Sequence, residues 1–167
     1  MYTMAGPEVA VASTKAYISQ MSLMYVLMLD IAYKKGEISR EEQMKLIDDL
    51  FDTAEKCAKT YDLLPDIQRF AHQEYTVKHV FFMGRGIDQA VSLEASLKLK
   101  EISYIHSEAY AGGELKHGTI ALIEDGSLVV ATSTQEHLFD KTISNIKEVK
   151  VRGAVVLGCL LYTSRCV

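Results

Sequence analysis

The chain has 167 residues, which is enough for one compact domain with its own core or for parts of two smaller domains. Its composition, 49% hydrophobic and 24% charged, is that of an ordinary soluble globular protein. The net charge of −4 leaves no basic surface for nucleic acid, so we expect no nucleic-acid partner.

No segment of the sequence indicates a membrane or a secretory route. The longest apolar stretch, residues 21–33, is interrupted by polar residues and is too short to cross a bilayer. No basic segment with a cleavage site opens the chain, so we expect no secretory signal. The chain has three cysteines: Cys57, Cys159 and Cys166. Their spacing shows neither a CxxC motif nor a disulfide framework, which fits a reducing compartment. We therefore expect a cytoplasmic protein with no membrane partner.

The first 36 residues predict one long helix. Pro7 and Glu8 suit a first helical turn, and Gly36 suits the position just past a helix end. The apolar residues of this helix form a broad surface that we interpret as core rather than as a cofactor site: Met21, Leu23, Met24, Val26, Leu27, Met28 and Ile31. Ser13 and Thr14 either cap a local turn or donate hydrogen bonds to a ligand.

Two further helices are predicted. Residues 39–42 form a capping-box pattern, which indicates a helix from Ser39 to about Thr60. Apolar residues at helical spacing predict a buried stripe on this helix: Leu46, Ile47, Leu50, Phe51 and Ala54. A short third helix follows Pro65. Together these helices predict a helical connector.

The stretch from Val80 to Gly118 predicts a strand, a glycine turn, a helix, a strand and a polar loop. Residues 80–83 form a short apolar run typical of a buried parallel strand. Gly84-Arg85-Gly86 permits a tight turn into a helix that runs from about Ile87 to Lys100. Gln89 stands where a third glycine would be sought, which argues against a nucleotide-binding fingerprint.

Strands and helices continue to alternate after this stretch. Residues 127–131 predict a strand, residues 136–150 an amphipathic helix, and residues 154–157 the start of a further strand. This alternation predicts an α/β domain with a parallel sheet and helices on both faces. Such sheets bind ligands at the carboxyl ends of their strands, where the glycine turn and the loop after Ile105 would lie.

Charged residues gather in the central stretch. Glu94, Lys98 and Glu101 fall at i, i+4 and i+7, on one face of the expected helix. The following loop adds further ionisable residues: Glu114, Lys116 and His117. Beside a glycine turn, such a set suits proton transfer on a small anionic molecule. Two alternatives need no chemistry: a solvated Glu–Lys helix pair, and a histidine that is only hydrogen-bonded within its loop.

Two motifs in the sequence resemble a known family. The words LEASLKLKEISYIHSEAYAGGELKHG and, earlier, AGPE followed by VASTKA are similar to the isomerase domain of glutamine–fructose-6-phosphate aminotransferase. The resemblance covers Ala5 to about Leu157. It implies a three-layer sugar isomerase (SIS) domain, with a parallel sheet flanked by helices and preceded by a helical connector.

The resemblance also divides the chain into three parts. Residues 1–76 are expected to hold the end of a first sugar isomerase subdomain and the helical connector, and residues 77–157 the first part of a second subdomain. Residues 158–167 form an atypical tail that we interpret as foreign sequence at a truncated end.

The same resemblance implies a reaction and the residues that carry it out. Fructose 6-phosphate is opened, aminated with ammonia from glutamine, and isomerised to glucosamine 6-phosphate. Glu101 matches the catalytic glutamate that moves a proton between C1 and C2. His117 matches the histidine of ring opening, which reaches the site of the neighbouring subunit, so we expect a homodimer.

The remaining matched residues surround the sugar phosphate. Lys98, which we group with the catalytic residues, and Glu94 match polar residues around the sugar ring and its hydroxyls. Val11, Ala12 and Ser13 match a segment that lines the sugar site. No cofactor and no metal are expected, and no His/Cys/Asp cluster in the sequence has metal-ligand spacing.

The sequence departs from the family pattern in several places. Thr119 follows His117 and Gly118 where the family has a proline, which leaves this loop less stiff. The phosphate-gripping segment, the glutaminase cysteine and the Schiff-base lysine have no counterpart in these residues, so we expect this chain alone to be inactive. Two alternatives stay open: another SIS-type sugar isomerase or deglycase, and a non-catalytic sugar-phosphate-binding module.

Overall fold

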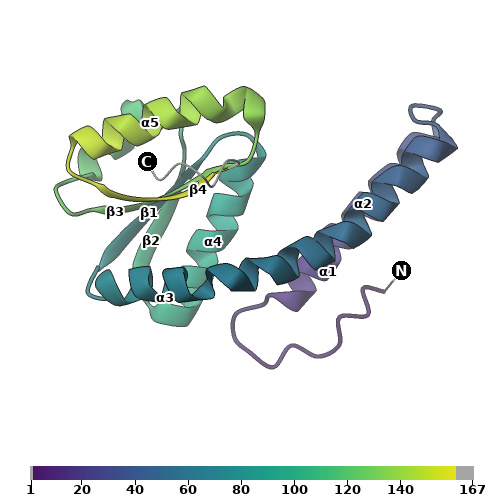
Figure 1. Cartoon of the computed structure of the whole chain (residues 1–167), viewed down its shortest axis with the longest axis horizontal. Coiled ribbons are helices and arrows are strands. Elements are labelled where there is room, and N and C mark those ends of the chain that lie inside the picture. The colour runs from purple at the N-terminus through teal and green to yellow at the C-terminus, as the bar shows by residue number, and fades with distance from the viewer. Residues whose placement is uncertain (1, 161–167) are drawn as a thin grey trace. The chain divides into compact units, whose positions relative to one another are not determined.

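The computed structural model describes residues 2–160 of the chain. The chain divides into two compact units, Met1–Gln73 and Glu74–Val167 (Figure 1). Among the described residues, the first unit is built from helices: α1 (Lys15–Lys34), α2 (Arg40–Lys59), the 3-10 helix η1 (Thr60–Leu63) and α3 (Leu64–Gln73).

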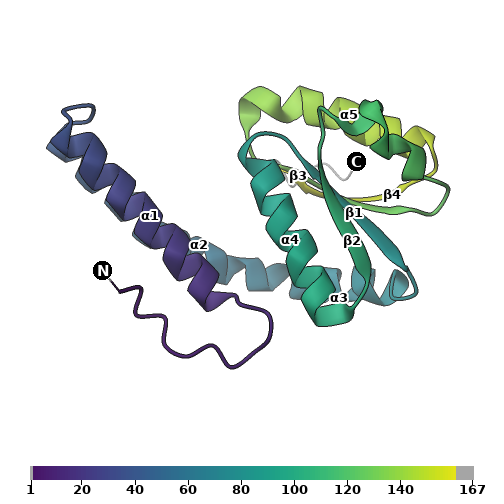
Figure 2. The ribbon, with the colours of Figure 1, turned by 180° about the vertical axis from the view of Figure 1, so that it is seen from behind.

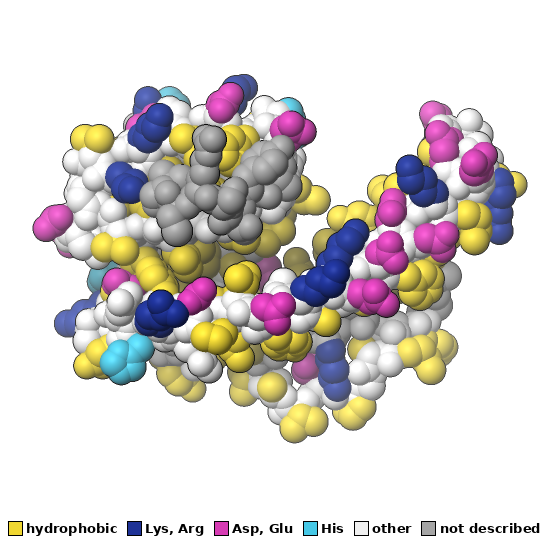
Figure 3. Space-filling model, in the orientation of Figure 1, with side chains coloured by type: hydrophobic (Ala, Val, Ile, Leu, Met, Phe, Trp, Pro, Cys, Tyr) yellow, Lys and Arg dark blue, Asp and Glu magenta, His cyan; other side chains and the backbone are white. Residues whose placement is uncertain are grey.

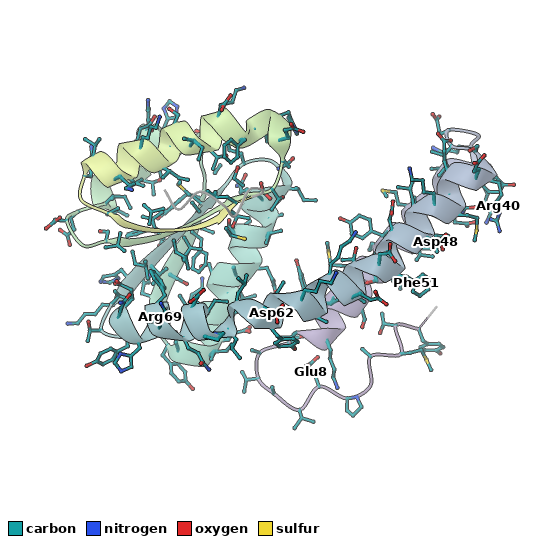
Figure 4. All side chains as sticks on the ribbon, viewed as in Figure 1. Glu8, Arg40, Asp48, Phe51, Asp62 and Arg69 are labelled. Carbon is teal, nitrogen blue, oxygen red and sulfur yellow. The ribbon has the colours of Figure 1, made fainter. Side chains whose placement is uncertain are left out.

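The first helix begins at Lys15, so the predicted start at Pro7 was wrong. The side chain of Glu8 explains the difference. Its Oε2 atom accepts hydrogen bonds from the Ala16 N–H at 3.2 Å and from the Ser13 hydroxyl at 3.4 Å. The carboxylate therefore satisfies a free amide in the first turn of α1 and faces the positive end of the helix dipole. Figure 4 shows Glu8 in the extended segment that leads to this helix.

The capping box at the start of α2 is confirmed. The Ser39 hydroxyl accepts from the Glu42 N–H at 3.1 Å, and Glu42 Oε2 accepts from the Ser39 N–H at 2.7 Å. The pKa of Glu42 lies below its ordinary value of 4.5. The main cause is the hydrogen bond from the Ser39 backbone, and the second cause is the hydrogen bond with the Ser39 side chain. A depressed carboxylate pKa adds stability that is present above pH 4.5 and is lost as the pH falls through the folded value.

The apolar faces of α1 and α2 are more exposed than the sequence predicted. Phe51 is 75% exposed and Met24 is 63% exposed, and Figure 4 shows the Phe51 ring pointing away from α2. Among the described side chains of these two helices, only Leu29 and Gln43 are buried. The two helices pack against each other along one interface, so apolar side chains elsewhere stay at the surface, as Figure 3 shows in yellow. The predicted core of this region was wrong.

The second unit is organised around a parallel sheet with the strand order β2-β1-β3-β4. Its described strands are β1 (His79–Gly84), β2 (His106–Ala111), β3 (Leu128–Ser133) and β4 (Val155–Leu160). Helix α4 (Ile87–Ser103) connects β1 to β2, and α5 (Phe139–Val151) connects β3 to β4. Three 3-10 helices lie in the loops: η2 (Leu115–His117), η3 (Thr119–Leu122) and η4 (Glu136–Leu138).

The strand order places one helix layer on each face of the sheet. From β1 the chain crosses to one side of the sheet through α4, and from β3 it crosses to the other side through α5. Right-handed crossovers in opposite directions put their helices on opposite faces. Figures 1 and 2, which view the unit from the two sides, show this arrangement. The predicted three-layer α/β architecture is confirmed.

The last strand extends beyond its predicted end. Gly158, Cys159 and Leu160 pair with the end of β3, so these first residues of the predicted atypical tail belong to the sheet. Residues 161–167 lie outside the described part of the chain, and the origin of the tail stays a prediction.

The two faces of the sheet are packed by different kinds of side chain. The α5 face carries an apolar core: Met83, Leu115, Val129, Ala131, Ile146 and Val149. The α4 face is close-packed through small residues, because Ser92 and Ser96 are buried and Ser96 Oγ lies 2.9 Å from Ser107 Oγ on β2. At Gly84, a Cβ atom would collide with the Asp88 backbone in the first turn of α4. Small residues therefore let α4 approach the sheet closely.

Ser39→Ala is expected to destabilise the helical unit by about 1 kcal/mol, because it removes the acceptor for the Glu42 amide. Urea unfolding followed by far-UV circular dichroism measures this loss. Ser22→Ala is the matched control, since the Ser22 hydroxyl bonds to the Ile18 carbonyl inside α1 and caps no helix end. Equal losses in the two variants would contradict the capping role.

Candidate functional site

A lysine held between two carboxylates lies on α4. Lys98 Nζ is 2.7 Å from Glu101 Oε2 and 3.3 Å from Glu94 Oε1. The side chains of Lys98, Glu101 and Glu94 are only 20%, 27% and 24% exposed. The pairing follows from helix geometry, since residues three and four apart face each other. We call these three residues the charged cluster, and its partial burial distinguishes it from a fully solvated helix face.

The two carboxylates stabilise the ammonium form of Lys98. The hydrogen bond to Glu101 raises the pKa of Lys98 above its ordinary value of 10.5, against an opposing effect of burial and with a further contribution from Glu94. At neutral pH the cluster therefore presents a positive charge flanked by two acceptors. Such a group can bind the hydroxyls of a sugar and can exchange a proton at a carboxylate.

The charged cluster does not lie beside the glycine turn, which corrects the prediction from the sequence. The turn precedes α4, and α4 runs back along the sheet to the start of β2. Glu101 lies about four helical turns beyond Ile87, which is roughly 21 Å at 1.5 Å per residue. The direction of the helix therefore carries Glu101 toward the amino edge of the sheet, away from Gly84-Arg85-Gly86.

Lys116 and His117 lie in the loop that follows the carboxyl end of β2, at the other edge of the sheet from Glu101. β2 ends at Ala111, and His117 is the last residue of η2, where its side chain is exposed. Lys116 forms an ion pair with Glu148 on α5 at 3.0 Å. Within one chain, the fold therefore does not bring His117 together with Glu101, because the two residues follow opposite edges of the sheet.

The segment from Val11 to Ser13 belongs to the helical unit, before α1. The Val11 side chain is 89% exposed, Ala12 is buried, and the Ser13 hydroxyl donates to Glu8 at 3.4 Å. Ser13 therefore makes a local contact of the kind that the sequence allowed as the alternative to sugar binding.

A buried carboxylate at the carboxyl edge of the sheet was missed by the sequence analysis. Asp88, in the first turn of α4, is 2% exposed. Its oxygens accept from the Thr134 N–H at 2.9 Å and from the Thr134 hydroxyl at 2.6 Å, and Gln135 Nε2 lies 3.4 Å away. This is the switch point between β1 and β3, where such sheets usually bind a ligand. The available signal was an acidic residue in a first helical turn.

Two further observations concern the described part of the chain. Within residues 2–160, no group of three or more His, Cys, Asp or Glu side chains is arranged to hold a metal ion. No helix in this range has both the length and the apolar character needed to cross a membrane.

These features define a fold class, an α/β domain in which a parallel sheet lies between two helical layers. Residues 75–160, more than half of the chain, match the family model of the SIS domain. The chain belongs to the SIS-domain family. The match includes all four described strands, the charged cluster on α4 and the loop that carries His117.

Two curated relatives of this chain are enzymes with the same name. The chain is 55% identical over 158 residues to the glutamine–fructose-6-phosphate aminotransferase (isomerizing) of Caldanaerobacter subterraneus subsp. tengcongensis. It is 56% identical over 161 residues to the protein of the same name from Clostridium tetani. Each match covers 95% of this chain and 26% of the relative, so the chain spans about a quarter of the length of these relatives.

Solved structures give the same family. The C-terminal domain of glucosamine-fructose-6-phosphate aminotransferase from Francisella tularensis matches with a TM-score of 0.90 and 36% identity, over 94% of this chain and 44% of that chain. Glucosamine-6-phosphate deaminase from Thermotoga maritima matches with a TM-score of 0.57 and 29% identity, over 91% of this chain and 44% of that chain. The resemblance inferred from the motifs is confirmed.

Asp88→Asn is expected to lower the free energy of unfolding by about 2–3 kcal/mol, because an amide NH₂ would face the Thr134 donors in a buried site. Denaturant unfolding of the whole chain measures this loss. Asp140→Asn is the control, because Asp140 is exposed in the first turn of α5 and its change costs at most about 1 kcal/mol. A loss no larger than that of the control would rule out a structural role for the Asp88 bonds.

The Lys98 ammonium is expected to titrate above pH 10.5, and Glu101→Gln to return its pKa toward 10.5, because Glu101 is the main cause of the shift. NMR titration of the lysine side chains measures both values, and Glu94→Gln gives a smaller change. Since the folded pKa is raised, the stability that the cluster adds is complete below pH 10.5 and is lost as the pH rises through the folded value. An unchanged pKa in Glu101→Gln would show that the hydrogen bond is not its cause.

Proposed function

We propose that the chain forms part of the isomerase region of a glutamine–fructose-6-phosphate aminotransferase. This activity converts fructose 6-phosphate, with ammonia from glutamine, into glucosamine 6-phosphate. The observation that carries the proposal is the 55–56% identity to curated enzymes of this name along 95% of the chain. The proposed activity is that of the whole relatives, of which this chain spans 26%.

In this proposal Glu101 is the base of the isomerisation. Its carboxylate takes a proton from one of the two carbons C1 and C2 and returns it to the other. The neighbouring Lys98 ammonium, 2.7 Å away, orients the carboxylate toward the carbon from which it takes the proton. Lys98 also supplies positive charge near any oxygen that gains negative charge in this step. Glu94 fixes Lys98 from the other side and binds sugar hydroxyls.

A second copy of the chain supplies His117 in this proposal. Ring opening moves a proton between the anomeric hydroxyl and the ring oxygen, and an imidazole can do this near neutral pH. In one chain His117 follows the carboxyl ends of the strands, whereas Glu101 lies toward the amino edge. That separation supports a site completed by a neighbouring subunit, and hence a homodimer. The cysteine pattern, which fits a reducing compartment, supports a location in the cytoplasm.

We also propose that the segment from Val11 to Ser13, in the first unit, contacts the sugar phosphate. The exposed Val11 leaves backbone groups accessible, and the Ser13 hydroxyl would exchange its 3.4 Å bond to Glu8 for one to the sugar phosphate. The proposed chemistry uses protonation and hydrogen bonding by side chains and requires no cofactor.

A chimeric enzyme tests the proposed function. Residues 5–157 of this chain replace the matching segment of the Clostridium tetani relative, and the formation of glucosamine 6-phosphate is measured. We expect an active chimera, in which Glu101→Gln lowers kcat by about 10²–10⁴-fold, the usual contribution of a positioned general base. The KM for fructose 6-phosphate should change little, because the amide keeps the size of the carboxylate.

Glu55→Gln in the same chimera is the matched control, because Glu55 is exposed on α2 and should leave kcat unchanged. A folded chimera without activity would contradict the assignment of the chain to this enzyme. An active chimera that tolerates Glu101→Gln would contradict the role of Glu101 and favour a binding role for the cluster.

A further inference from the structure

We propose that a hollow at the carboxyl edge of the sheet binds the phosphate group of a small molecule. The hollow has a volume of about 220 Å³ and is lined by residues from two loops and from α5: Arg85, Gly113, Lys116, Lys141, Ser144, Asn145 and Glu148. We call it the α5 hollow. It shares no residue with the charged cluster on α4, and it goes beyond the proposed isomerase chemistry.

Arg85 is the best-positioned donor in the α5 hollow. Its Nε atom donates to Asn145 Oδ1 at 3.0 Å, and its backbone carbonyl accepts from Gln135 Nε2 at 2.7 Å. A Cβ atom at Gly113 would lie 3.4 Å from Arg85 Nη1, and one at Gly112 would lie 2.9 Å from Asn145 Oδ1. Two consecutive glycines therefore leave the space that the guanidinium group occupies. An arginine fixed in this way can present its remaining N–H groups to phosphate oxygens as a fork.

The charge of the lining favours an anion. Three cationic side chains come from three separate segments, Arg85 after β1, Lys116 in η2 and Lys141 in α5, against one carboxylate. Lys116 pairs with that carboxylate, whereas Lys141 has no ion-pair partner among the described residues. A protein with a net charge of −4 thus carries a local excess of positive charge at this edge. A phosphate group, with several oxygens and up to two negative charges, can accept from all three segments at once.

Glu148 is the residue that a bound phosphate must compete with. Its oxygens accept from Lys116 at 3.0 Å, from Asn145 Nδ2 at 3.3 Å and from the Ser144 hydroxyl at 3.5 Å. These are the types of donor that bind a phosphate oxygen, so the carboxylate occupies the role of the anion. Replacing Glu148 with a neutral residue frees Lys116 and removes a repulsive charge, which should strengthen phosphate binding.

The position and size of the hollow agree with a phosphate-bearing ligand. Parallel sheets bind ligands beyond the carboxyl ends of their strands, and here the neighbouring switch point is filled by the Asp88 carboxylate. The volume of about 220 Å³ is below the ~300–1,000 Å³ typical of pockets for drug-sized ligands, which limits the occupant to a small molecule. Inorganic phosphate and a hexose 6-phosphate share the required group.

Calorimetric titration of the 167-residue chain at low ionic strength tests this proposal, with inorganic phosphate and fructose 6-phosphate as the two probes. Lys141→Gln should weaken binding roughly 2–5-fold, the effect of one partly exposed charge. Glu148→Gln should tighten binding by a similar factor. The matched control is Lys147→Gln, because Lys147 is exposed on the same helix and does not line the hollow.

Amide chemical shifts supply a second readout that does not depend on affinity alone. Saturating phosphate should shift the amides of Gly112, Gly113 and Ser144 and leave those around Lys98 unchanged. Tighter binding of fructose 6-phosphate than of inorganic phosphate would assign the hollow to a phosphorylated sugar, and equal binding would assign it to the free anion.

Three results would overturn the proposal. The first is no binding of either probe, and the second is equal affinity in Lys141→Gln and Lys147→Gln. The third is binding that Glu148→Gln does not strengthen but Lys98→Gln abolishes, which would place the phosphate at the charged cluster instead. The chimera experiment reports on Glu101, so failure of the α5 hollow and failure of the proposed enzyme function give different results.

Discussion

The buried carboxylate of Asp88 is the contact on which the sheet unit depends. It joins the start of α4 to the segment after β3, and a polar group this deeply buried is tolerated only when its oxygens are hydrogen-bonded. Independently of this contact, the backbone at Asp88 leaves no room for a Cβ atom at Gly84. The Asp88 carboxylate also closes the switch point to any ligand that would need the donors of Thr134. The two ligand sites that we propose lie elsewhere, on the charged face of α4 and in the hollow beside α5.

Sequence patterns predicted the sheet unit well because its signals are local. The apolar run before the glycine turn, the alternation of strands and helices and the spacing of Glu94, Lys98 and Glu101 each depend on neighbouring residues, and each corresponds to an element or contact of the structure. The prediction that the cluster lies beside the glycine turn was wrong for a geometric reason. Residues that are close in sequence lie far apart in space when they sit at opposite ends of a helix. The bond between Asp88 and Thr134 joins positions 46 residues apart, and no local pattern indicates it.

The helical unit shows the limit of periodicity as a signal. Apolar spacing identified the apolar faces of α1 and α2, but it does not say what covers them, and side chains such as Phe51 lie at the surface. The predicted start of α1 was wrong for a different reason. Pro7 and Glu8 have the residue types of a first helical turn, yet Glu8 reaches across to the amide of Ala16 and holds the preceding chain outside the helix. Composition allowed both outcomes, and a side-chain contact decided between them.

The charged cluster and the α5 hollow differ in how much of the fold they require. Lys98 reaches its partners three and four residues along one helix, so a few turns of α4 are enough to form the cluster. Arg85, Lys116 and Lys141 come from segments that meet only when the sheet and α5 are assembled. Helical turns form within about a microsecond, well before a parallel sheet completes its long-range pairing. A partly folded chain would therefore carry the cluster but not the hollow, which makes the hollow a marker of completed tertiary structure.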